Sequence, residues 1–380
     1  MVFDRLVEFF LVRPDAISVW SYREVRESLS WYYSVMVNEK PAKYRIVKRI
    51  EAPLNPYEPG ADLGELWKVH DKLAEEFKRV WRDVRETGLN IDELGVPKYS
   101  FLDVKIALAR ELMRNCSICE RRCGARRWEG KPGVCLMADQ CIVHSYFHHL
   151  GEEAPLVPSG TIFYGGCNFR CVFCQNYDIS QVEPRGGVAV TPRQLALIQE
   201  ELRRYGARNI NHVGGEPTPN IHTILASFKY LNVNVPQLWN SNMYLTQEAL
   251  RLILHVMDIW LPDFKYGNDQ CATRLSAAPR YFEVVTRNLR EAVMHGDMII
   301  RHLVLPGHIE CCTKPVLKWI AENLPRDRVL VNIMDQYRPE FMVLKYPRRW
   351  PEITRRPSRR EMEEAYEYAR RLGIVFEPVS

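Results

Sequence analysis

The sequence lacks any long uncharged hydrophobic run, and this absence narrows what the chain can be. No segment approaches the roughly 18 consecutive apolar residues that a membrane-spanning helix needs. The amino-terminal segment 1–15 carries charges at Asp4, Arg5, Glu8 and Arg13, so it lacks the continuous apolar centre of a secretory signal. A strong charge imbalance is also missing: a net charge of +5 over 380 residues neither requires nor excludes a nucleic-acid partner. We therefore expect a cytoplasmic protein with no membrane partner.

What the chain does contain is cysteine, eleven residues in all. Without a secretory signal, this number indicates a reducing compartment and metal ligation rather than disulfides. The fractions of 46% hydrophobic and 26% charged residues are those of a soluble globular protein. At 380 residues the chain exceeds one average domain, so we expect a large core with an accessory region.

Three cysteines, Cys167, Cys171 and Cys174, stand at C-x3-C-x2-C spacing after a short apolar run, 161–164, that reads as a strand. Thiolates suit iron–sulfur clusters, which usually take four of them. Three thiolates on one loop would bind three irons of a cubane and leave the fourth iron open to a substrate or cosubstrate. A zinc knuckle favours paired C-x2–4-C units, and a ferredoxin needs a fourth nearby ligand.

The segment 167–174, with Phe173 before the last cysteine, resembles the signature of the radical S-adenosylmethionine (SAM) superfamily. The resemblance implies a [4Fe–4S] cluster whose open iron is chelated by the amino and carboxylate groups of SAM. Reduction then cleaves the sulfonium to methionine and a 5′-deoxyadenosyl radical. On the same resemblance we place Phe173 in the cofactor site.

A glycine pair and a carboxylate, Gly214-Gly215-Glu216, follow the next predicted strand. Glycines let backbone approach a ligand closely, although a simple turn would use the same residues. Because the motif lies one strand–helix unit after the cysteine loop, it resembles the superfamily's GGE motif. That resemblance implies that all three residues hold the amino group of SAM.

From residue 161 the sequence alternates between strand and helix patterns, as in a parallel sheet. Periodicity alone does not distinguish one doubly wound α/β fold from another. The superfamily resemblance, which covers about residues 110–380, implies a partial (βα)6 radical SAM barrel. The expected strands are 161–164, 209–213, 237–240, 258–263, 299–305 and 329–333, and the expected helices are 192–204, 220–230, 247–256, 281–295 and 314–322.

Polar residues close several of these strands, at the edge where α/β barrels place their chemistry. Asn242 follows the third strand, and Asp263-Phe-Lys265 ends the fourth in a step that resembles a SAM- or cation-contacting motif of glycyl-radical activating enzymes. A salt bridge that closes the barrel is an equal alternative for Asp263 and Lys265. Arg301 and His302 point to opposite faces of their strand, and Arg301 suits the carboxylate of SAM. We place Asn242, Asp263, Lys265 and Arg301 in the cofactor site.

A second thiol set, Cys116, Cys119, Cys123 and Cys135, precedes the barrel at x2, x3 and x11 spacing. Tetrahedral zinc and an auxiliary [4Fe–4S] cluster both fit this set, and reduced thiols without metal are the third option. Similar segments precede the signature in proteins that resemble pyruvate formate-lyase activating enzymes, which favours a metal here.

Other residues with ligand chemistry have more ordinary interpretations. A second metal site could be built from His144, His148 and His149 with Glu152 and Glu153, but we expect polar residues that line the barrel mouth. For His308, on a rim loop, substrate contact and plain exposure are equal alternatives. We expect the remaining pair, Cys311 and Cys312, to serve packing.

Four regions follow from these patterns. We expect a helical accessory region at 1–110, a Cys-rich metal-binding segment at 111–150, the radical SAM partial barrel at 151–345, and a basic loop and helix at 346–380. In the first region, an amphipathic helix ends near Gly88, and Ser100 with Asp103 predicts a capping box.

Taken together, the motifs indicate a radical SAM oxidoreductase that resembles pyruvate formate-lyase activating enzymes and abstracts hydrogen from an unidentified substrate. They assign no residue to the abstraction itself. A flavodoxin- or ferredoxin-like electron donor is expected, and a protein substrate is one option. The alternatives are radical-based modification of RNA or a peptide, in which nucleic acid is the less favoured partner, and a non-catalytic iron–sulfur electron carrier.

Overall fold

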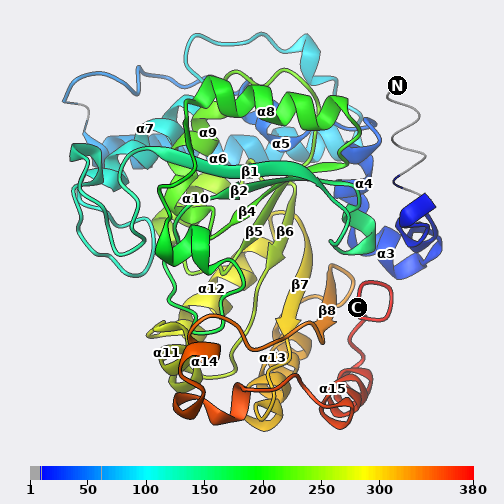
Figure 1. Ribbon diagram of the computed structural model, residues 1–380. Helices are drawn as coiled ribbons and strands as arrows, with labels where there is room; N and C mark the ends of the chain where they lie inside the picture. The colour runs from blue at the N-terminus through cyan, green and yellow to red at the C-terminus, as the bar shows by residue number, and fades with distance from the viewer. Residues whose placement is uncertain (1–8, 10, 61) are drawn as a thin grey trace.

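The computed structural model describes residues 9, 11–60 and 62–380, and within them one eight-stranded sheet organises the chain (Figure 1). Its order is β3-β1-β2-β4-β5-β6-β7-β8, and all neighbours from β2 onward pair in parallel. The parallel strands are β2 (Ser159–Tyr164), β4 (Asn209–Gly214), β5 (Gln237–Ser241), β6 (Ile259–Pro262), β7 (Asp297–Leu303) and β8 (Val329–Met334). All six coincide with predicted strands to within two residues at each end, so the α/β partial barrel is confirmed.

Helices connect the parallel strands along the outer face of the sheet, with α8 and α9 above it and α12 and α13 below it in Figure 1. The first of them, α8, begins at Thr191, whose hydroxyl accepts from the backbone N–H of Gln194, and Pro192 occupies the first turn. One short helix, α11, was not predicted. The bounds are α8 (Pro192–Arg204), α9 (Ile221–Ser227), α10 (Gln247–Ile253), α11 (Asp269–Ser276), α12 (Tyr281–Val293) and α13 (Lys314–Asn323).

Two antiparallel strands, β1 (Cys141–His149) and β3 (Val188–Val190), extend the sheet beyond β2. Phe147 pairs with Thr161 and His149 with Ser159, so the histidine-rich end of β1 lies beside the first residue of β2. That is the opposite end of the sheet from the barrel mouth. The expectation that the histidines line the mouth is therefore wrong for His148 and His149, because the antiparallel direction of β1 carries them away from it. His144 stays at the mouth end of β1, where its Nε2 lies 3.3 Å from the carbonyl oxygen of Pro184.

The amino-terminal helices α2 (Asp15–Ser18), α3 (Arg23–Ser28) and α4 (Ser30–Met36) close the bottom of the barrel, where the parallel strands begin. Several of their buried apolar residues, among them Val25 and Tyr32, form one cluster with inward-facing residues of β5 to β8. Tyr32 lies at the centre: its hydroxyl donates to the carbonyl of Pro155 at 3.3 Å and accepts from Asn209 Nδ2 at 3.0 Å. Part of the accessory region is therefore the floor of the barrel.

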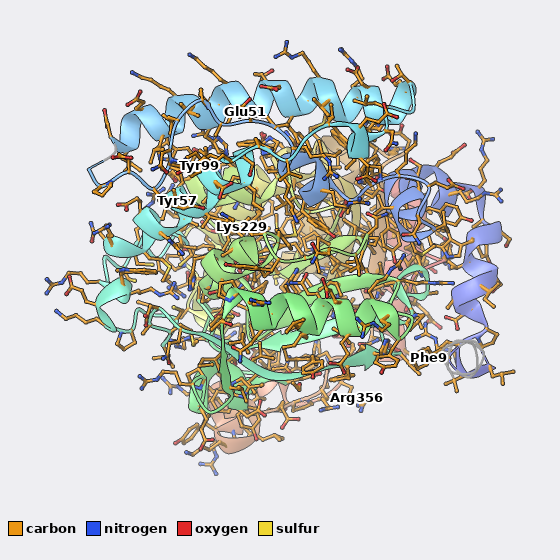
Figure 2. The ribbon with its side chains drawn as sticks, turned by 90° about the horizontal axis from the view of Figure 1, so that it is seen from above. Phe9, Glu51, Tyr57, Tyr99, Lys229 and Arg356 are labelled. Carbon is orange, nitrogen blue, oxygen red and sulfur yellow. The ribbon has the colours of Figure 1, made fainter. Side chains whose placement is uncertain are left out.

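The rest of the accessory region, α5 (Lys43–Val47), α6 (Leu63–Glu86) and α7 (Phe101–Arg114), packs outside the barrel, where α7 contacts both α6 and α9. The predicted capping box at Ser100 and Asp103 is confirmed. The buried carboxylate of Asp103 also accepts from the Tyr57 hydroxyl at 2.8 Å and pairs with Lys229. Figure 2 shows Tyr57, Tyr99 and Lys229 close together, where this carboxylate ties the accessory layer to the barrel.

The carboxyl-terminal part of the chain folds back onto the barrel. It contains α14 (Met342–Lys345) and α15 (Arg359–Leu372), and α15 packs against α13. The capping box at Ser358 and Glu361 is present, and Glu361 also accepts from the backbone N–H of Gly307 at 2.7 Å. Within the described part of the chain, no helix combines the length and apolarity that a membrane crossing requires.

Replacing Asp103 tests how the accessory layer is attached. We expect Asp103→Ala to lower the free energy of unfolding by about 3 kcal/mol, because a helix cap and both hydrogen-bonding partners of this buried carboxylate are lost together. The matched Asp62→Ala change removes an exposed cap of α6 that holds only the Gly64 N–H, and we expect about 1 kcal/mol. Urea unfolding measures both, and equal losses would contradict the linking role of Asp103.

Candidate functional site

The loop that carries Cys167, Cys171 and Cys174 leaves the carboxyl end of β2 at the barrel mouth. Gly166 turns the backbone there with φ of +81°, and a Cβ at this position would lie 2.3 Å from Met137 Cγ. Only glycine allows the loop to lie this close to the Cys-rich segment.

Each of the three sulfurs has a hydrogen-bonding group beside it. Cys167 Sγ accepts from the backbone N–H of Phe169 at 3.3 Å and Cys171 Sγ from the Ser276 hydroxyl at 3.0 Å. Cys174 Sγ lies 3.4 Å from the Ser180 hydroxyl. Burial raises the pKa of all three thiols, that of Cys171 to about 11. Their thiolates therefore need a bound cation or cluster for charge compensation, which fits an iron–sulfur donor set.

The carboxylate of Glu216 is buried across the cavity from this loop and is held by protein donors. Its Oε1 accepts from the hydroxyls of Ser241 at 2.6 Å and Thr218 at 2.5 Å, and from the Thr218 N–H at 3.3 Å. Its Oε2 accepts from the backbone N–H of Asn242 at 3.0 Å. Burial raises the pKa of Glu216, and these hydrogen bonds oppose the rise. Glu216 is therefore a buried carboxylate whose position is fixed by protein hydrogen bonds.

The two glycines before Glu216 let β4 meet the cysteine loop. Gly214 has φ of +117°, and a Cβ there would lie 2.1 Å from the backbone nitrogen of Tyr164. A Cβ at Gly215 would lie 2.4 Å from the carbonyl oxygen of Gly166. Side chains at either position would force the thiol loop and the Glu216 wall apart.

Asn242 links the same two walls. Its Nδ2 donates to the side-chain oxygen of Asn168, in the cysteine loop, at 2.7 Å, and its own backbone N–H donates to Glu216. The side-chain oxygen accepts from the N–H of Tyr244 at 3.0 Å, which fixes the amide. The structure thus gives Asn242 a positioning role beside the first thiol.

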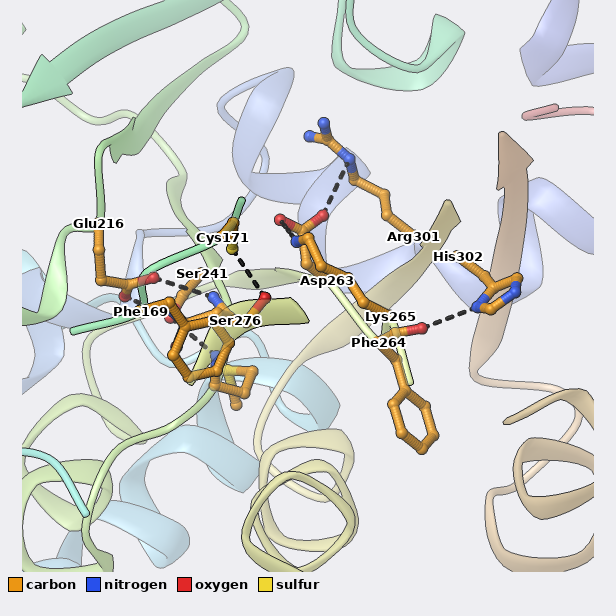
Figure 3. Close-up of polar contacts among 12 residues, drawn as sticks. Phe169, Cys171, Glu216, Ser241, Asp263, Phe264, Lys265, Ser276, Arg301 and His302 are labelled. Atoms are coloured by element: carbon orange, nitrogen blue, oxygen red, sulfur yellow. Dashed lines mark hydrogen bonds and ion pairs between the residues drawn. The ribbon is translucent and has the colours of Figure 1, made fainter. Parts of the chain in front are cut away.

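The charged residues Asp263, Lys265 and Arg301 lie on the opposite wall, and Figure 3 shows Arg301 directed toward Asp263. Lys265 Nζ lies 2.6 Å from Asp263 Oδ2, so the predicted salt bridge is present. Burial alone would raise the pKa of Asp263, but Lys265 and then Arg301 lower it below its ordinary value. His302 points away from the cavity to the carbonyl of Phe264, as strand alternation requires.

Below the cavity, Arg301 also approaches two carboxylates that precede β2. Its guanidinium lies 3.4 Å from Glu152 and 3.6 Å from Glu153. Asn211 donates to Glu152 at 2.9 Å and Asn332 to Glu153 at 2.8 Å. Burial raises the pKa of Glu152 to about 7. The two glutamates therefore form a polar layer inside the barrel, not a metal site with the histidines of β1.

One cavity is lined by every residue predicted for the cluster and for SAM. Phe173, for example, lies buried in its wall, edge-to-face with Tyr337 at 5.5 Å between ring centroids. The binding roles of the residues stay predictions, but their convergence on one space is observed. The predicted residues in the lining are Cys167, Cys171, Phe173, Cys174, Gly214, Gly215, Glu216, Asn242, Asp263, Lys265 and Arg301.

The second thiol set also gathers in space. A Cβ on Gly133 would lie 3.1 Å from Cys123 Sγ and 3.7 Å from Cys135 Sγ. Burial raises the pKa of Cys116 and raises that of Cys119 to about 12, with further contributions from neighbouring thiols of the set. The segment contacts the barrel through an isolated antiparallel β-bridge between the backbones of Cys119 and Leu245, just before α10.

Several site residues escaped prediction from the sequence. Ser241 and Thr218 hold Glu216, and Ser276, at the end of the unpredicted helix α11, holds Cys171. Ser241 stands between Asn240 and Asn242 at a strand end, a signal that could have identified it. Ser276 has no local signal, because its role depends on tertiary packing alone.

Comparison with known proteins follows this geometry. The Radical SAM superfamily model matches residues 161–320. Protein MJ0674 of Methanocaldococcus jannaschii is 41% identical over 351 residues, which cover 91% of this chain and 98% of the relative. A second protein of the same organism, MJ0808, is 30% identical over 122 residues, 27% of this chain and 35% of the relative.

Solved structures with a similar fold are more distant. Streptococcus suis SuiB bound to its precursor peptide SuiA aligns with a TM-score of 0.40 and 13% identity, over 55% of this chain and 46% of SuiB. A radical SAM methyltransferase from Sphaerobacter thermophilus aligns with a TM-score of 0.40 and 15% identity, over 57% of this chain and 65% of that enzyme. Likenesses this weak say nothing about substrate.

The contact between the two walls can be tested at Gly214. We expect Gly214→Ala to destabilise the protein by about 3 kcal/mol and to reduce its iron content, because the new methyl group meets the backbone of β2 at a positive φ. Gly95→Ala is the control, since open space surrounds that position, and we expect a change within about 0.5 kcal/mol. Thermal unfolding and iron analysis measure the outcome, and a Gly214→Ala protein with full stability and iron would disprove the argument.

Proposed function

We propose that this chain, which belongs to the radical SAM superfamily and to the same protein family as its Methanocaldococcus jannaschii relative MJ0674, reductively cleaves SAM and uses the resulting 5′-deoxyadenosyl radical to abstract hydrogen from a substrate. A [4Fe–4S] cluster on Cys167, Cys171 and Cys174 would supply the electron and an open iron. The observation that carries the proposal is the single cavity between these thiols and the buried carboxylate of Glu216.

Glu216 is suited to hold the amino group of SAM. A carboxylate offers about four lone-pair positions. Three protein donors share the two lone pairs of Oε1, whereas Oε2 accepts only from the Asn242 N–H and so keeps one lone pair for a further hydrogen bond. An ammonium group would also compensate the buried negative charge of Glu216. Because an unpaired charge is costly to bury, this compensation would contribute more than the hydrogen bond itself.

We assign Arg301 a positioning role rather than direct contact with the carboxylate of SAM. Three protein carboxylates, those of Asp263, Glu152 and Glu153, already surround its guanidinium within 3.6 Å. Arg301 would therefore fix Asp263 at the cavity wall and anchor it to the polar layer below. Within the described residues Lys265 forms an ion pair with Asp263 alone, so it is the better candidate for an anionic group of SAM.

The finer resemblance to pyruvate formate-lyase activating enzymes extends the proposal to an oxidoreductase that abstracts hydrogen from a carbon of its substrate. Reductive cleavage needs one electron from outside, so we propose a flavodoxin- or ferredoxin-like donor in the cytoplasm. A protein substrate fits the activase resemblance. Once SAM and substrate fill it, the cavity would protect the radical from water and side reactions.

Two alternative functions receive less support. In the basic carboxyl-terminal segment, Arg355 pairs with Glu361 at 2.7 Å and Arg359 with Glu363 at 2.7 Å, so part of the charge available to RNA is already neutralised. A simple electron carrier would have no use for the hydrogen-bonded wall around Glu216. Catalysis on SAM explains both the thiols and that wall.

For the second thiol set we favour an auxiliary [4Fe–4S] cluster over zinc. Sulfurs around a tetrahedral zinc ion lie about 3.8 Å apart, given Zn–S bonds of about 2.3 Å. Among the described residues, the four thiols of this set contain no trio whose sulfurs all lie within 4.8 Å of one another. A cubane holds its ligands farther apart than a single ion does, so the wider spacing suits a cluster.

Formation of 5′-deoxyadenosine tests the central proposal. Reconstituted anaerobically and given SAM and a strong reductant, the wild-type protein is expected to release 5′-deoxyadenosine, whereas Cys167→Ala releases none above background. Cys141→Ala removes a buried thiol outside both sets and is expected to retain activity. Equal product from the wild type and Cys167→Ala would reject SAM cleavage at this site. The absence of product from a wild-type protein that holds its full complement of iron would reject it as well.

The role of Glu216 is testable by SAM binding. We expect Glu216→Gln to raise the Kd for SAM by about 10- to 100-fold, because a charge-assisted hydrogen bond contributes about 1.5–3 kcal/mol. Glu183→Gln changes an exposed carboxylate and serves as the matched control. Equilibrium dialysis with labelled SAM gives both constants. An unchanged Kd for Glu216→Gln would remove this residue from the cofactor site.

Iron content distinguishes the options for the second thiol set. About eight irons per chain are expected in the wild type and about four in both Cys116→Ala and Cys167→Ala, since each [4Fe–4S] cluster carries four. Wild-type protein with about four irons, of which Cys116→Ala loses none, would exclude the auxiliary cluster.

A further inference from the structure

Outside the cavity, three residues with metal-ligating side chains converge: Cys271 in α11 and His308 and Cys311 after β7. Their ligand atoms all lie within 4.8 Å of one another, and no other described residues form such a group of three or more. None of the three lines the cluster cavity. Packing was the expected use of Cys311, but its side chain is exposed, so that expectation is wrong; only its neighbour Cys312 is buried.

The spacing of the two sulfurs matches a shared metal ion. Cys271 Sγ and Cys311 Sγ lie 3.9 Å apart. Two thiolates bound to one tetrahedral zinc ion at about 2.3 Å are separated by about 3.8 Å. A disulfide would need about 2.05 Å, and both cysteines are free thiols here.

The hydrogen bonding of His308 leaves one of its ring nitrogens available to a metal ion. Its Nδ1 lies 3.0 Å from the carbonyl oxygen of Pro306, and because a carbonyl only accepts, Nδ1 must carry the proton. The lone pair is therefore on Nε2. Metal-binding histidines typically donate their second nitrogen in this way, which fixes the ring and strengthens the ligand. The side chain is buried, so its orientation is restrained by packing as well.

The backbone around the trio is fixed before any ion binds. His308 precedes a π-helical turn, Ile309–Thr313, which carries Cys311. Asn268 caps α11 by accepting from the Cys271 N–H at 2.8 Å, and its Nδ2 donates to the Cys311 carbonyl at 2.7 Å. The same Nδ2 lies 3.4 Å from Cys271 Sγ, where it can donate to a thiolate. The side-chain amide of Asn268 thus fixes the positions of Cys271 and Cys311 relative to each other.

We propose that Cys271, His308 and Cys311 bind a zinc ion, or a divalent cation of similar softness, separate from both iron–sulfur sites. Two thiolates and a neutral imidazole are a common zinc donor set with a fourth position open. Water would take that position, or Cys312, whose Sγ lies 4.0 Å from that of Cys311. The two thiolates balance the charge of the ion.

The consequence of this ion lies at the other end of α11. Ser276, its last residue, donates to Cys171 Sγ at 3.0 Å, and its carbonyl accepts from the Arg170 N–H at 2.9 Å. An ion that holds Cys271 against the β7–α13 connection would fix the helix on which the cluster loop rests. The zinc site would then be structural, at the start of the helix that positions Cys171.

Zinc content of the full chain tests the proposal. In protein purified anaerobically with reductant, we expect Cys311→Ser, Cys271→Ser and His308→Gln each to contain about one zinc ion per chain less than the wild type. Glu310→Gln, an exposed change within the same turn, is the control and is expected to keep the ion. Because the comparison is a difference, zinc in the Cys116–Cys135 segment does not affect it.

Cobalt titration gives a second readout. The zinc-free wild type is expected to gain thiolate-to-cobalt charge-transfer absorption and tetrahedral visible bands, both weakened in Cys311→Ser, whose exposed position makes misfolding a poor explanation. Unchanged zinc across the variants, or a Cys271–Cys311 disulfide in the purified protein, would overturn the proposal. Neither measurement depends on SAM cleavage, so this site and the proposed function fail or stand separately.

Discussion

The structure depends on one buried carboxylate, that of Glu216, which must be compensated where the sheet meets the cysteine loop. Burial without partners would be costly, and donors from Ser241, Thr218 and Asn242 supply those partners. These donors connect β4 to the end of β5, and Asn242 continues the connection to the loop that carries Cys167. The same hydrogen bonds that make the carboxylate tolerable therefore set its position relative to the thiols. A wall built this way is rigid before any cofactor arrives, which is the preorganisation a site for radical chemistry needs.

The barrel below this wall is closed by parts of the chain that contain no ligand motif. The amino-terminal helices fill its apolar bottom around Tyr32, and Glu152, Glu153 and Arg301 form a charged layer above them. Arg301 reaches from that layer to Asp263 at the cavity. The accessory region is thus part of the barrel's architecture, although its sequence contains no ligand motif. Its helices α6 and α7 pack outside the barrel, and Asp103 of α7 connects them to it through an ion pair with Lys229.

Prediction from the sequence succeeded where the signal is local. Strand and helix periodicity, the capping box at Ser100 and the spacing of the thiols from Cys167 onward all lie within a few neighbouring residues, and each was found in place. The two antiparallel strands and the role of Glu152 depend on pairing between distant segments, which no local pattern encodes. Ser276 and the trio around His308 belong to the same class, because they come together only when α11 packs against the barrel. The substrate is not encoded by the scaffold, since cofactor chemistry and substrate recognition use different residues.

The most direct test of the central claim is electron paramagnetic resonance of the reduced protein with and without SAM whose amino nitrogen is isotopically labelled. If Cys167, Cys171 and Cys174 hold a cubane with one open iron, SAM should shift the g-values of the cluster signal, and the label should show hyperfine coupling to it. The Cys116→Ala variant should give the same shift, because the second thiol set lies outside the cavity. A cluster signal unchanged by saturating SAM, with no coupling to the label, would show that a fourth ligand from the protein closes the site and would contradict the account.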